Sequence, residues 1–148
     1  MCFAHVIRET AANAERILAH SETGYRLLRG NNFAIANFMN YLREFGGKGS
    51  RFDYLLGELI GSDPNDPNVY RFAIEYLWNK GQLTEALALA RKLERLCTPP
   101  INPRTLYCYR QDLQIAHLLE RGQFDPLEEA RRIVRDLENA AGARRDHP

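Results

Sequence analysis

The stretch 66–100 constrains the fold of this chain more than any other part of the sequence. Apolar side chains recur every three or four residues between 70 and 77 and again between 86 and 96, which is the spacing of two amphipathic helices. Gly81 lies between them, and a glycine at this place predicts a residue in the left-handed backbone conformation that ends a helix. Pro99 prevents the second helix from continuing. The stretch therefore predicts two antiparallel helices joined by a tight turn.

This helix pair resembles one unit of the tetratricopeptide repeat (TPR) family. Such repeats are about 34 residues long, with a large apolar residue early in the first helix, glycine at the turn, alanine in the second helix and proline at the exit. The matching positions here are Tyr70, Leu77, Gly81, Leu83, Ala86, Ala90 and Pro99. Ile74 departs from the family, which prefers a small residue there.

Two less regular copies of the pattern flank the central one. The upstream copy has Ile35, Phe38, Leu42, Gly46, Phe52, Leu56, Leu59 and Pro64, and the downstream copy has Ile115, Leu118, Gly122, Phe124 and Ala130. The resemblance implies an all-α fold, a TPR-like right-handed superhelix of antiparallel helix pairs with about six or seven helices. One domain would comprise an N-terminal helical segment (1–31), a degenerate repeat (32–66), the best repeat (67–100), a third helix pair (101–141) and a frayed tail (142–148).

Three Asx–Pro pairs predict where helices begin, because the Asx side chain accepts a backbone N–H and proline suits the first helical position. The pairs are Asp66–Pro67, Asn102–Pro103 and Asp125–Pro126. The oxygen-rich loop 62–68 lacks the glycine and the distal glutamate of a hand-type calcium site, so capping explains it better. Single helices are expected at 104–121 and 126–140. Gly24 is a candidate break in the first helical segment, and Ser50 with Asp53 has the spacing of a capping box.

Composition and charge exclude several classes of protein. The 148 residues carry a net charge of +1 with acids and bases interspersed, so no field that would gather nucleic acid is expected. No uncharged segment is long enough to span a membrane. The N-terminus lacks a basic start followed by a sustained apolar region, which argues against a secretory signal, and we expect a cytoplasmic protein.

Few residues form a pattern that indicates catalysis or a cofactor. Cys2, Cys97 and Cys108 have no metal-binding spacing, so buried reduced thiols are the simplest interpretation, with a redox pair of Cys97 and Cys108 as the alternative. Cys2 would be N-terminal after loss of Met1 and resembles the nucleophile of class II glutamine amidotransferases. Those enzymes need a layered sheet domain, for which the sequence offers no alternating strands. We therefore predict a non-enzymatic protein without metal or cofactor.

The resemblance places a binding surface on the concave face formed by the first helix of each pair. The residues expected there are Asn40, Arg43, Glu44, Asn68, Arg71, Glu75, Trp78, Asn79, Tyr109 and Asp112. Trp78 is the strongest candidate, because an exposed aromatic side chain beside hydrogen-bonding groups is typical of an interface hot spot. The alternative is that Trp78 packs against Leu83 or a neighbouring helix.

The first functional hypothesis is an adaptor that binds another protein or a peptide segment in its concave face. The second is a structural subunit that assembles with further copies of itself or with a larger complex. An amidotransferase-like enzyme and an RNA-binding repeat protein are less favoured alternatives. The segment 1–31 either forms a further repeat or covers the binding face.

Overall fold

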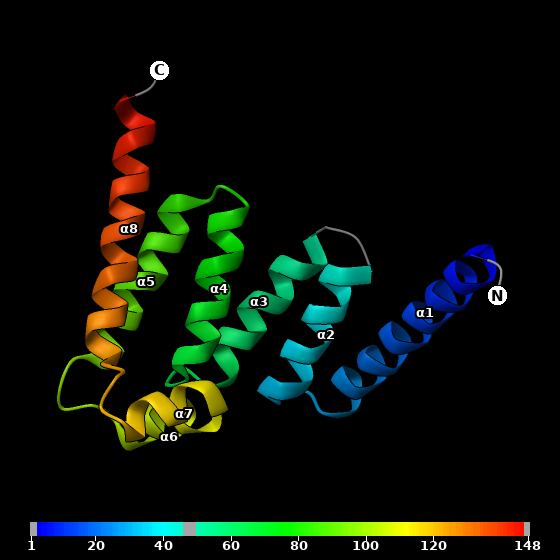
Figure 1. Ribbon diagram of the computed structural model, residues 1–148, viewed down its shortest axis with the longest axis horizontal. Helices are drawn as coiled ribbons and strands as arrows, with labels where there is room; N and C mark the ends of the chain where they lie inside the picture. The colour runs from blue at the N-terminus through cyan, green and yellow to red at the C-terminus, as the bar shows by residue number, and fades with distance from the viewer. Residues whose placement is uncertain (1–2, 46–49, 147–148) are drawn as a thin grey trace. The chain divides into compact units, whose positions relative to one another are not determined.

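The computed structural model describes the backbone of residues 3–45 and 50–146 and the side chains of 12–42 and 51–143. This part of the chain is all-helical, as predicted, and contains eight helices, one more than the expected upper number, and no strand (Figure 1). The helices are α1 (Phe3–Leu27), α2 (Asn32–Phe45), α3 (Ser50–Ser62), α4 (Pro67–Asn79), α5 (Leu83–Cys97), α6 (Pro103–Gln111), α7 (Leu113–Glu120) and α8 (Pro126–Asp146). They form two compact units, Met1–Pro64 and Asn65–Pro148.

The first unit packs α1 against α2 and α2 against α3. Its core centres on Phe38 of α2, which is fully buried and stacks on the ring of Tyr25 with ring centroids 5.4 Å apart. The Tyr25 hydroxyl donates a hydrogen bond of 2.7 Å to Glu58 and so connects α1 to α3. This hydrogen bond holds the pKa of the Glu58 carboxyl below its usual value, although partial burial opposes the effect.

The sequence suggests a break at Gly24 and an end of the first helical segment at Gly30, and the structure confirms only the second. Gly24 was a candidate break, but α1 continues through it to Leu27. The chain turns at Gly30 instead, where φ is +81°, a conformation that side chains with a Cβ rarely adopt. The capping box expected at Ser50 and Asp53 falls outside the described residues, because the Ser50 side chain is not described.

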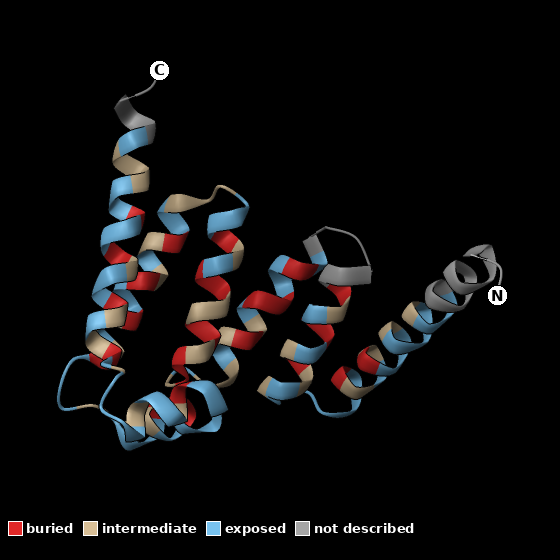
Figure 2. Ribbon diagram, viewed as in Figure 1, coloured by how far each residue is buried: buried red, intermediate tan, exposed pale blue. Residues whose placement is uncertain are grey.

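The second unit packs α4 and α8 against α5, and α6 against α4 and α7. Buried residues recur along α4 and α5, whereas α7 is mostly exposed (Figure 2). Ala86 and Ala90 are completely buried on α5, so these small side chains lie where neighbouring helices approach closely. Gly81 has φ of +82° and turns the chain between α4 and α5 as predicted.

All three Asx–Pro pairs cap helices in the predicted way. The side-chain oxygens of Asp66, Asn102 and Asp125 accept backbone N–H groups two residues ahead at 3.0, 2.8 and 3.0 Å. Each proline then occupies the first helical position. The capping interpretation of the loop at 62–68 is thereby confirmed for Asp66.

Two predicted helices have different bounds in the structure. The single helix expected at 104–121 is interrupted at Asp112, whose carboxylate accepts the backbone N–H groups of Gln114 at 3.0 Å and Ile115 at 3.3 Å and starts a new helix. The last helix continues to Asp146, beyond the expected end at Ala140 and into the tail expected to be frayed. None of the helices in the described part of the chain combines the length and apolar character that a bilayer crossing requires.

Candidate functional site: a groove between α4 and α8

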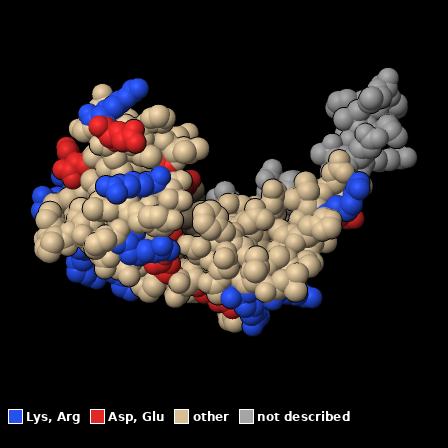
Figure 3. Space-filling view, turned by 90° about the horizontal axis from the view of Figure 1, so that it is seen from below, with Lys and Arg blue, Asp and Glu red and all other residues tan. Residues whose placement is uncertain are grey.

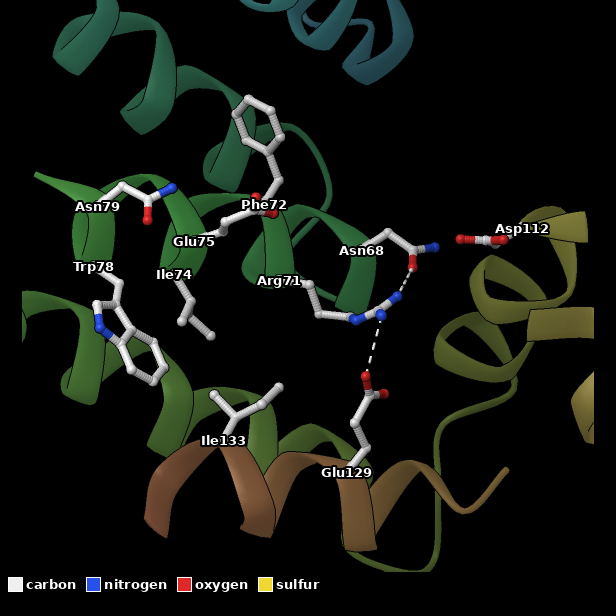
Figure 4. Close-up of a pocket in the computed structure, with 10 residues that line it drawn as sticks. All are labelled: Asn68, Arg71, Phe72, Ile74, Glu75, Trp78, Asn79, Asp112, Glu129 and Ile133. Atoms are coloured by element: carbon white, nitrogen blue, oxygen red, sulfur yellow. Dashed lines mark hydrogen bonds and ion pairs between the residues drawn. The ribbon is translucent and has the colours of Figure 1, made fainter. Parts of the chain in front are cut away.

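A groove of about 490 Å³ lies in the second unit between α4 and α8 (Figure 4). It is the place where most of the side chains expected on the binding face come together. Its lining residues are Asn68, Arg71, Phe72, Ile74, Glu75, Trp78 and Asn79 of α4, Asp112 before α7, and Glu129 and Ile133 of α8.

Helix α4 supplies most of this lining. The position of its first turn and the helical repeat of about 3.6 residues together determine which side chains lie in two neighbouring rows along the groove. Asp66 and Pro67 set the first turn, and positions three or four apart then share one side of the helix. Arg71, Ile74 and Trp78 form the stripe that points toward α8 in Figure 4. The adjacent stripe contains Asn68, Phe72, Glu75 and Asn79. At about 1.5 Å per residue, the lined part of α4 is roughly 16 Å long.

A network of hydrogen bonds centred on Arg71 joins the helices around the groove. The Arg71 Nη2 atom lies 3.1 Å from Oε1 of Glu129 on α8, and Nη1 donates to the Asn68 side-chain oxygen at 3.4 Å. The amide of Asn68 donates to the carbonyl of Cys108 on α6 at 3.0 Å. The Arg71 and Glu129 side chains are 32% and 15% exposed, so the pair is partly shielded from water. Arg71 therefore connects α4 to α8 and has little freedom to bind an anion.

Three apolar side chains face the same hollow from both walls of the groove. Ile74 is almost completely buried, Ile133 is half-buried, and Trp78 keeps 37% of its surface exposed (Figure 4). Within the described part of the chain the indole N–H of Trp78 has no hydrogen-bond acceptor. Trp78 therefore presents both apolar surface and an unused donor at the surface of the groove.

Two polar groups on the neighbouring stripe of α4 are also unengaged. Glu75 and Asn79 are exposed, and their side chains make no hydrogen bond or ion pair with any described residue. Asp112, by contrast, uses its carboxylate to cap α7. The groove thus combines an apolar section with free polar groups, an arrangement suited to binding.

The structure separates the ten residues expected on the binding face into four groups. Six of them line the groove: Asn68, Arg71, Glu75, Trp78, Asn79 and Asp112. Asn40 is exposed on α2 in the first unit and is not among the lining residues, and the side chains of Arg43 and Glu44 lie outside the described residues.

Among the expected groove residues whose side chains are described, Tyr109 is the one that is inaccessible. It is completely buried, its hydroxyl lies 3.4 Å from the Cys97 sulfur, and its ring meets that of Phe124 edge to face with centroids 5.4 Å apart. Burial raises the pKa of Tyr109 and also that of the Cys97 thiol. Cys97 and Cys108 are both buried and form no disulfide with a described residue, as expected, while Cys2 lies outside the described residues.

Sequence reasoning missed four residues of the groove, namely Phe72, Ile74, Glu129 and Ile133. By their apolar helical spacing Ile74 and Ile133 are typical of core residues, and Glu129 stands among the opposite charges that are typical of the solvated side of a helix. Glu129 stands four residues before Ile133, so the two share one side of α8. That spacing was the available signal, but nothing in the sequence indicates which residue of α4 Glu129 meets.

Charges of both signs are interspersed over the second unit on the face shown in Figure 3.

Comparisons with protein-family models, with curated proteins and with solved structures gave no match to this chain.

Proposed function

We propose that this chain is a non-enzymatic adaptor that binds a peptide segment or a protein surface in the groove between α4 and α8. The observation that carries the proposal is Trp78, which is partly exposed, with an unused N–H group, beside the apolar side chains of Ile74 and Ile133. A tryptophan in such a setting is typical of the residues that dominate the energy of protein interfaces. The resemblance to TPR proteins supports the same face, because α4 is the first helix of the best repeat.

The hydrogen-bond network around Arg71 also supports binding. Because Arg71 connects α4 to α8, and Asn68 connects α4 to α6, the walls of the groove are held before any ligand arrives. A preformed site loses less conformational freedom on binding than one that must be ordered by its ligand.

Selection from a displayed library of random dodecapeptides tests this proposal. We expect the wild-type protein to enrich a set of related sequences and Trp78→Ala to bind them at least about 30-fold more weakly, the loss associated with a hot-spot residue. Tyr107→Ala is the matched control, because Tyr107 is an exposed aromatic residue of the same unit that does not line the groove. Circular dichroism should show the same helix content for both variants.

The adaptor proposal fails if no sequence is enriched on the wild type. It fails equally if the enriched peptides bind Trp78→Ala as tightly as they bind Tyr107→Ala.

Self-assembly is a second candidate function, favoured by an exposed apolar cluster in the first unit. At the turn between α1 and α2, Leu27, Leu28 and Phe33 are 78%, 55% and 76% exposed. The first unit also carries few charged residues on the face shown in Figure 3. Clustered apolar surface of this kind is characteristic of sites that bind another protein.

If copies of the chain associate through this cluster, light scattering coupled to size-exclusion chromatography should show a dimer or larger species that Phe33→Glu converts to monomer. The reason is that a buried charge without a partner would oppose association. A wild-type monomer at every protein concentration used would exclude self-assembly.

A further inference from the structure

We propose that the occupant of the groove is a peptide that carries a basic side chain close to a large apolar one. This inference rests on the adaptor function proposed above and adds to it the chemical class of the ligand. It is drawn from the charges of the lining residues, from which of them are already engaged, and from their spacing along α4.

The lining of the groove is acidic. Among the described residues that line it, Arg71 alone carries a positive charge, against the three carboxylates of Glu75, Asp112 and Glu129. A basic ligand is therefore favoured over an acidic one by the potential of the groove as a whole, because complementary charge steers and stabilises association.

The engaged groups strengthen this preference. Arg71 already donates to Glu129 at 3.1 Å and to Asn68 at 3.4 Å, so an acidic ligand would have to displace a carboxylate held in place by the fold. Asp112 caps α7 through two backbone N–H groups. Glu75 is the exposed carboxylate that remains free of partners in the described chain. It is consequently the group that would receive a ligand cation.

The position of Glu75 sets the distance between the two ligand groups. Glu75 and Trp78 are three residues apart on α4, which places their Cβ atoms about 5–6 Å from each other. A ligand whose apolar side chain covers Trp78 should therefore carry its cation two residues away if it is extended, or three to four residues away if it is helical. Lysine or arginine next to leucine or a larger side chain at this spacing fits both contacts.

A directed dodecapeptide library tests the inference. One position is fixed as leucine or tryptophan, and the positions two, three and four residues away are randomised. We expect Lys and Arg to exceed Asp and Glu at those positions by at least about 3-fold after selection on the wild type, and the excess to fall as salt is added. A selected peptide and its Lys-to-Glu copy should differ in affinity by roughly 3- to 10-fold.

Glu75→Lys should abolish or reverse this charge preference, because it replaces the free carboxylate of the groove with a cation. Glu120→Lys is the matched control, since Glu120 is exposed, free of ion pairs among the described residues and outside the groove lining. Both substitutions change the net charge by the same amount, so a difference between them reports the position of the charge.

The outcomes separate the inference from the function on which it rests. Trp78-dependent enrichment without a basic excess, or with an excess that Glu75→Lys leaves unchanged, overturns the inference and leaves the adaptor function standing. Absence of Trp78-dependent enrichment overturns both. A basic excess that is lost in Glu75→Lys and kept in Glu120→Lys supports both.

Discussion

Replacing Tyr109 with alanine is expected to lower the free energy of unfolding by about 3–5 kcal/mol, the range for truncating a large buried aromatic side chain. Tyr109 is completely buried, meets Phe124 edge to face, and its hydroxyl contacts the Cys97 sulfur. The truncation would leave a cavity between α6, α5 and the segment before α8. Urea denaturation followed by circular dichroism measures the change.

Two further substitutions make the Tyr109 result specific. Tyr107→Ala on the same helix should change the stability by no more than about 0.5 kcal/mol, because Tyr107 is 51% exposed. Tyr109→Phe should cost about 1 kcal/mol, since only the hydroxyl and its contact with Cys97 are lost. An effect of Tyr109→Ala as small as the one expected for Tyr107→Ala would contradict the burial of Tyr109.

Replacing Phe38 with alanine is expected to destabilise the first unit by a similar amount, about 3–5 kcal/mol. Phe38 is completely buried on α2, stacks on Tyr25, and has the Arg51 guanidinium 5.0 Å from its ring centroid. The substitution therefore removes apolar burial, ring stacking and a cation–π contact together. Thermal and urea unfolding of the variant should both shift to milder conditions.

Phe33→Ala is the control for Phe38→Ala, because both residues are phenylalanines of α2 and Phe33 is 76% exposed. Its effect on the stability of the monomer should be within about 0.5 kcal/mol. A loss at Phe33 as large as the loss at Phe38 would show that the core of this unit does not lie where Phe38 is placed.

The ends of most helices were predictable because they depend on local chemistry. Asx–Pro pairs and Gly81 act through hydrogen bonds and backbone conformation within a few residues, so their role can be read without knowledge of the tertiary structure. Gly24 shows the converse: its helix continues because a single glycine costs only about 1 kcal/mol, and the burial of Ser21 and Tyr25 on either side of it holds the helix in place.

The interruption at Asp112 explains the errors in the predicted third helix. In a continuous helix at 104–121, Tyr109 and Leu113 would lie four residues apart on the same side and would be buried or exposed together. Because Asp112 ends one helix and caps the next, the helical phase is reset, and Leu113 is 80% exposed while Tyr109 is completely buried. Aspartate before an apolar run is a recognisable capping signal, but the uninterrupted apolar pattern outweighed it.

The candidate site was predictable on α4 and much less so elsewhere. The resemblance to TPR proteins, applied to the apolar period of α4, implied that Arg71, Glu75 and Trp78 lie on its binding face, and all three line the groove. The opposite wall comes from α8, where Glu129 lies 58 residues after Arg71, and its place depends on how α8 packs against α5. Glu129 and Ile133 could be assigned to the groove only from that tertiary contact.

Trp78 is also the single tryptophan of this chain. Since it is partly exposed and lines the groove, its fluorescence comes from the site and from nowhere else in the protein. A ligand that covers the indole would exclude water from it and move its emission to shorter wavelengths. Occupancy of the groove can therefore be followed in the unlabelled protein by its tryptophan fluorescence.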